Sequence, residues 1–137
     1  MALQEQRVLQ KVIRELRTDK ELSRPNWQML RSVFGKRFFQ AWDLVVKRRI
    51  KKYIFRPSER EVWIAIGNSG EYLIYPHAGY CSCSDFYFRV LDEEVAFCYH
   101  LLAQKLAEAL EYYESILEED EFYRELMDIW KAYAMED

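Results

Sequence analysis

The side chains with the most distinctive chemistry are three cysteines and a histidine, which occur in two close pairs. Cys81 and Cys83 form a C-x-C pair, and Cys98 and His100 form a C-x-H pair after fourteen intervening residues. The chain has no other cysteine. Thiolate and imidazole are the ligands that zinc prefers, and four of them complete a tetrahedral site. The pattern therefore predicts zinc held by all four residues, although ligand type alone does not separate zinc from iron or cobalt.

The two pairs must reach one point through different local structures. Cys81 and Cys83 can point the same way from an extended segment, because residues two apart share a strand face. Cys98 and His100 cannot do so from a regular helix, because two residues turn about 200°. We therefore expect them in the turn that leads into the following helix, HLLAQKLAEAL. The free N–H groups of that turn can donate hydrogen bonds to sulfur and stabilise thiolate.

The thiols have three other interpretations. Scattered cysteines are often small buried hydrophobic residues, but two pairs with a histidine favour ligands. A disulfide between Cys81 and Cys83 would be strained and would leave Cys98 alone. A catalytic Cys–His pair would need a group to orient the base and a glycine turn for an oxyanion, and neither is evident. Paired acids such as Glu93 and Glu94 show no spacing for a second metal or an acid–base site, so we expect no enzyme.

The elements around the motif are predicted from apolar periodicity and turn residues. Helical spacing predicts helices over 3–17, from Ser23-Arg24-Pro25 to Gly35, and over about 37–49. Alternation then predicts an antiparallel meander with strands at 50–56, 61–66 and 71–75 and a short strand or turn at 80–84. Helical spacing returns from about Val95 to Leu117, and a last helix follows Asp120. His77 is expected in a loop, with an outer-shell or substitute-ligand role as the alternative.

The segments YCSCSDFYFRVL and CYHLLAQKLAEAL resemble the SWIM zinc finger, whose pattern is CxC, a spacer, and CxH leading into a helix. The resemblance covers about residues 60–110 and is strongest to small SWIM proteins related to the SWIM subunit of the Shu complex, archaeal relatives included. Two features depart from it: Tyr99 stands where the family often has a basic residue, and the first 55 residues carry no known motif. The resemblance implies a closed, structural zinc site at Cys81, Cys83, Cys98 and His100.

The resemblance also implies a function. It predicts a non-enzymatic interaction protein, an accessory subunit that binds a RecA-family recombinase paralogue in homologous recombination and DNA repair. The expected fold is α+β, with N-terminal helices, a small antiparallel sheet running into a ββα SWIM zinc finger, and C-terminal helices. We expect one domain over 1–137, with a helical part at 1–55, the sheet and zinc finger at 56–110, and a helical segment at 111–137.

The chain is also expected to be intracellular. Its first residues lack the apolar core of a signal peptide, and no run is long enough for a membrane span. The location would be cytoplasmic in a prokaryote or archaeon and nuclear in a eukaryote.

Charge is divided along the chain. Residues 1–60 carry 16 Lys and Arg against 6 Asp and Glu, whereas residues 61–137 carry 4 against 17. Either the two halves face each other, or a basic surface meets nucleic acid or an acidic partner and an acidic surface meets a basic one.

Two segments carry most of this charge. The basic stretch, a candidate for direct DNA contact, consists of Lys47, Arg48, Arg49, Lys51 and Lys52. A stand-alone DNA-binding zinc-finger module is therefore the alternative function; a solvated face or a dock for an acidic partner are the other interpretations. The acidic run after residue 110 predicts a helical hairpin packed on the core, or a docking surface.

Overall fold

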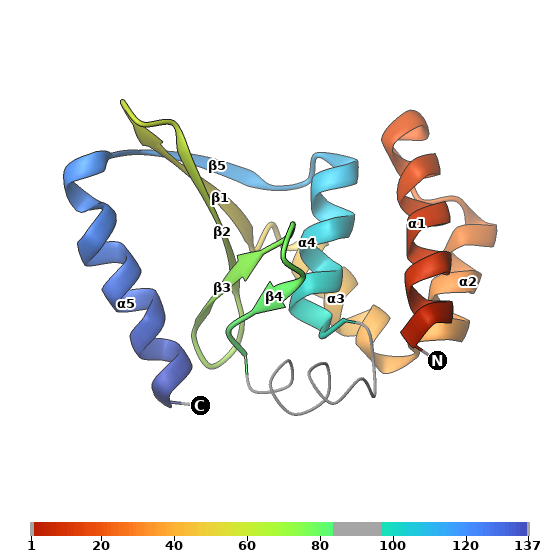
Figure 1. Ribbon diagram of the computed structural model, residues 1–137. Coiled ribbons are helices and arrows are strands. Elements are labelled where there is room, and N and C mark those ends of the chain that lie inside the picture. The colour runs from red at the N-terminus through yellow and green to blue at the C-terminus, as the bar shows by residue number, and fades with distance from the viewer. Residues whose placement is uncertain (1, 84–96, 137) are drawn as a thin grey trace.

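The computed structural model describes residues 2–83 and 97–136 (Figure 1). Its first part is helical, as expected, and contains α1 (Ala2–Asp19), α2 (Arg24–Phe34) and α3 (Lys36–Val46). The Ser23 side chain caps α2 by accepting a hydrogen bond from the Asn26 N–H, and Pro25 lies in its first turn. Gly35 separates α2 from α3 with a φ of 59°, a conformation that favours glycine.

A five-stranded sheet follows, with the strand order β4-β3-β2-β1-β5. The first four strands form the predicted antiparallel meander: β1 (Ile50–Arg56), β2 (Arg60–Ile66), β3 (Glu71–Tyr75) and β4 (Tyr80–Cys81). The fifth strand, β5 (Glu114–Glu119), pairs with β1 in parallel, and Tyr53 lies opposite Ile116. The α+β class is confirmed, and the sheet is mixed.

The expected helical hairpin after residue 110 is wrong. Helix α4 (Tyr99–Leu110) ends where Glu111 adopts a φ of 62°, and the N–H groups of Glu111 and Tyr112 donate to the last carbonyls of the helix. The chain then continues as β5, followed by a short 3₁₀ turn η2 (Asp120–Phe122) and by helix α5 (Tyr123–Glu136).

The apolar residues of the sheet face two separate clusters, one on each side. The zinc-side cluster lies between the sheet and helices α1 to α4 and includes Trp63, Tyr72, Ile74 and all three cysteines. The α5-side cluster consists of Phe55, Val62, Ile64, Leu73, Met127 and Trp130. Figure 1 shows α5 alone on one side of the sheet and α4 with the N-terminal helices on the other. No helix in the described ranges is long and apolar enough to cross a membrane.

Candidate metal centre

The C-x-C pair lies at the end of the meander. Cys81 closes β4 opposite Ile74 of β3. Beyond it, the Ser82 N–H donates to the Leu73 carbonyl at 3.0 Å, and the Leu73 N–H donates to Ser82 Oγ at 2.9 Å. These two bonds hold the segment extended, so Cys81 and Cys83 share one face and both are buried. Ser82, which the sequence did not single out, therefore positions its two neighbours.

The C-x-H pair lies in the turn that leads into α4, as predicted. Cys98 is the N-cap of the helix, and its Sγ accepts a hydrogen bond from the Leu101 N–H at 3.4 Å. His100 occupies the first helical turn. A buried ion pair steadies the preceding residue: Arg37 pairs with Glu5 and also donates to the Phe97 carbonyl at 2.8 Å. The helix start thus supplies one thiol that is already hydrogen-bonded and one imidazole beside it.

The structure brings all four predicted ligands together. Their donor atoms lie within 4.8 Å of one another, and each residue is at least 95% buried. Neither ring nitrogen of His100 has a hydrogen-bond partner within the described ranges. A buried imidazole without a partner is costly unless it binds something else, and a metal ion satisfies it. The donor set and its burial fit a structural zinc ion, with no ligand position left for water or substrate.

The three thiols change one another's acidity. The hydrogen bond with Cys83 raises the pKa of Cys81 well above its usual range. Hydrogen bonds from Cys81 and then Cys98 lower the pKa of Cys83. The hydrogen bond with Cys81 lowers the pKa of Cys98. The hydrogen bond with Cys83 and burial outweigh it, so the pKa of Cys98 is raised overall. Negative charge therefore concentrates on Cys83, and a bound zinc ion would supply the charge that lets the other two thiols ionise.

Three residues that were not predicted to belong to the site lie around the His100 ring. The Tyr72 and Tyr99 rings lie 4.5 and 4.1 Å from it, centroid to centroid. A Cβ on Gly67 would stand 3.3 Å from His100 Nε2 and 3.0 Å from Tyr72 Cε2. No role was predicted for Gly67 from the sequence. Its lack of a side chain leaves room for the imidazole.

Other candidate residues lie elsewhere. His77 lies in the turn between β3 and β4 and is absent from the cluster. Glu93, Glu94, Val95 and Ser84 lie outside the described residues.

The basic stretch is engaged with neighbouring side chains. Lys47 pairs with Asp43 at 3.0 Å, and the Arg48 guanidinium lies 4.1 Å from the centre of the Tyr112 ring. The next contacts pair Lys51 with Glu114 and Lys52 with Glu61, both at 3.4 Å. For Arg49 the described contacts are backbone hydrogen bonds to Leu44 and Ile66. Several contacts join the basic half to the acidic half, which favours the self-complementary interpretation. DNA contact stays a prediction.

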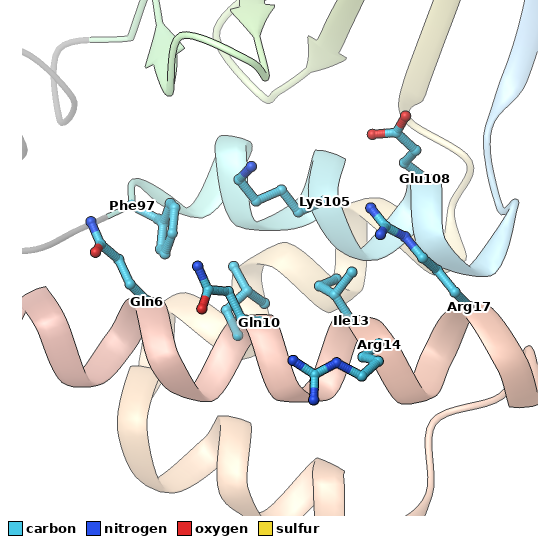
Figure 2. A pocket seen from close by; sticks show the side chains of 9 residues that line it. Gln6, Gln10, Ile13, Arg14, Arg17, Phe97, Lys105 and Glu108 are labelled. Atoms are coloured by element: carbon cyan, nitrogen blue, oxygen red, sulfur yellow. The ribbon is translucent and has the colours of Figure 1, made fainter.

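A groove of about 620 Å³ lies between α1 and α4, and none of the four predicted ligands lines it. Figure 2 shows Gln6, Gln10 and Arg17 extending from α1 beside Phe97, Lys105 and Glu108. Burial lowers the pKa of Lys105, whereas nearby Glu108 favours its charged form. Among the described residues, the groove cations Arg14, Arg17 and Lys105 form no ion pair within 4.0 Å.

The fold and the site together define a zinc-finger protein in which the metal is structural. A zinc finger SWIM domain-containing protein 7 homolog of Dictyostelium discoideum is 30% identical over 116 residues, which cover 83% of this chain and 74% of that protein. The chain belongs to the family of zinc finger SWIM domain-containing protein 7.

Two vertebrate relatives carry the same family name. The Mus musculus protein is 40% identical over 83 residues, and the Danio rerio protein is 39% identical over the same length. These alignments cover 59% of this chain and 54% and 59% of the two relatives, so the match spans little more than half of each. No family model and no solved structure matches the chain.

Proposed function

We propose that this protein is a non-enzymatic interaction subunit that binds a RecA-family recombinase paralogue and assists homologous recombination. One observation carries the first part: the four zinc ligands are buried and complete, so the metal has no open position at which a reaction could occur. The partner follows from the resemblance to small SWIM proteins of recombination complexes. Because zinc ligands must stay reduced, we also propose an intracellular location.

The groove between α1 and α4 is the surface that we propose for this partner. Its α4 wall begins at the two zinc ligands Cys98 and His100, so the metal holds the wall in place. Its cations favour an acidic surface on the recombinase paralogue, and Phe97 and Ile13 offer apolar contacts. Zinc thereby supports binding without touching the partner.

The test is affinity purification of the tagged chain from its native cells at moderate salt after nuclease treatment, with mass spectrometry of what co-purifies. We expect a RecA-family ATPase in near-stoichiometric amount. Arg14→Glu should reduce its recovery about tenfold, as expected for loss of a well-placed interfacial charge. Lys11→Glu, the same charge change at an exposed position of α1 outside the groove, is the control.

Two results would count against this proposal. If the zinc-loaded wild-type chain recovers no such ATPase, the partner is wrong. If Lys11→Glu and Arg14→Glu lower recovery equally, the groove is not the docking surface.

A further inference from the structure

The outer edge of β5 is open. β5 is the last strand of the sheet and pairs through all six residues with β1, from Lys51–Glu114 to Arg56–Glu119. Within the described part of the chain no strand pairs with its other edge. Figure 1 shows β5 running along the upper margin of the sheet, with α4 and α5 at its two ends. The Glu119 N–H already donates to Glu118 Oε1 at 3.2 Å. The other N–H and C=O groups that point away from β1 can pair with a further strand.

This edge has little of the protection that isolated edge strands usually carry. Natural edges are blunted by short strands, charged side chains, proline or bulges, and of these β5 carries charged side chains, its three glutamates. The segment ESILEE contains no proline, lysine or glycine. It pairs with β1 over as many residues as β2 does. Leu117 is 59% exposed beside Ile54 of β1, and Ser115 is exposed as well. An extended segment could therefore add both hydrogen bonds and apolar contact.

The charge of the edge limits what can add to it. Glu114 is paired with Lys51, but among the described residues Glu118 and Glu119 have no Lys or Arg within 4.0 Å. Asp120 and Glu121 follow directly. A side-chain hydrogen bond with Glu121, followed by the negative charge of that residue, raises the pKa of Glu119. A second copy would place acidic β5 against acidic β5, and like charges across a strand pair are unfavourable.

We propose that β5 accepts a basic, extended segment of a partner protein as a sixth strand of the sheet. The alternation along β5 specifies that segment. One face presents Glu114, Ile116 and Glu118, because these residues lie opposite Lys51, Tyr53 and Phe55; the other presents Ser115, Leu117 and Glu119. A complementary strand thus has aliphatic residues at its centre and Lys or Arg toward its ends. This site is separate from the groove and does not depend on the recombinase paralogue.

The test uses the full zinc-loaded chain and a short synthetic peptide with valines at its centre and lysines at both ends. Hydrogen exchange with mass spectrometry should show slower exchange in residues 114–119 when the peptide binds, and fluorescence titration gives the affinity. The same peptide N-methylated at alternate amides keeps its charge and apolar surface but cannot pair as a strand. We expect it to bind at least tenfold more weakly.

Two variants localise the effect. Glu119→Lys adds a lysine at an exposed position of the edge, and Asp128→Lys makes the same charge change at an exposed position of α5. Glu119→Lys should weaken peptide binding about tenfold and Asp128→Lys should leave it nearly unchanged. The proposal is overturned if the peptide does not bind, if the N-methylated peptide binds equally well, or if both variants weaken binding alike. Slower exchange in β5 that grows with protein concentration alone would assign the edge to a second copy and also overturn it.

Discussion

The two sides of the sheet are stabilised in different ways, although β3 contributes to both. Tyr72 and Ile74 face the zinc-side cluster, whereas Leu73 between them faces α5. On the α5 side, large apolar groups fill the space: Trp130 is fully buried, its ring lies 4.9 Å from that of Tyr53, and its Nε1 donates to Glu71 at 3.1 Å. Burial of aromatic surface can hold this side without a ligand.

The zinc side has a polar, ionisable centre. Three thiols and an imidazole converge on one point there, and the imidazole has no hydrogen-bond partner in the described ranges. Such a centre is unfavourable unless a metal ion binds it. The difference implies that chelation should affect the two sides unequally, with the zinc side failing first.

Loss of a zinc ligand should destabilise the protein most. Cys98→Ala removes both a thiolate and the cap of α4, so it should abolish stoichiometric zinc binding and cost on the order of 4 kcal/mol or more in the free energy of unfolding. Elemental analysis and chemical denaturation measure the two effects. Treatment of the wild type with a strong chelator should reproduce the destabilisation. Unchanged zinc content and stability in Cys98→Ala would contradict the assignment of Cys98 as a ligand.

The next effect tests the other side of the sheet. Trp130→Ala should cost about 3–5 kcal/mol, because it empties a fully buried site. Folded protein should nevertheless keep its zinc, since Trp130 belongs to the α5-side cluster. Trp130→Phe is the matched variant: it keeps most of the packing and removes the bond to Glu71, at a cost of about 1 kcal/mol. Loss of zinc from folded Trp130→Ala would mean that the two sides are not independent.

The sequence predicted the zinc side better than the other side, for a physical reason. Ligand chemistry is local: the residue types of two short pairs predict a site for a thiolate-binding metal such as zinc. The rotation per residue of a helix places Cys98 and His100 at the start of α4. The role of Gly67 was missed because a turn glycine looks the same whether or not a ring lies against it.

Strand β5 was missed because its pairing partner lies far away in the sequence. Leu110, Tyr113 and Leu117 have a helical spacing, but Tyr113 packs on Trp63 at 4.8 Å and Leu117 is exposed. The left-handed conformation of Glu111 ends α4, and parallel pairing with β1 then defines the strand. Local periodicity predicts neither the end of α4 at Glu111 nor the pairing of β5 with β1, because strand pairing depends on tertiary contacts.

Two glycines in the turn between β2 and β3 lie against opposite sides of the sheet. A Cβ on Gly67 would press on His100 and Tyr72, whereas a Cβ on Gly70 would lie 2.5 Å from Tyr133 Cδ1 of α5. Each alanine variant should cost about 1–3 kcal/mol through overpacking. Only Gly67→Ala should also weaken zinc affinity, which competition with a chromogenic chelator measures. Equal zinc affinities in the two variants would show that the ring of His100 can shift without loss of coordination.

The smallest effect concerns how the C-x-C pair is held. Ser82→Ala removes the oxygen that accepts from the Leu73 N–H at 2.9 Å, while the Ser82 N–H can still donate to the Leu73 carbonyl. One lost hydrogen bond costs about 1 kcal/mol. This bond holds the segment that carries Cys81 and Cys83 against β3. We therefore expect Ser82→Ala to lower both stability and zinc affinity slightly, and Ser82→Thr, which keeps the hydroxyl, to restore both. If stability falls and zinc affinity stays at the wild-type value, the ligands are positioned by the metal itself and not by this strand pairing.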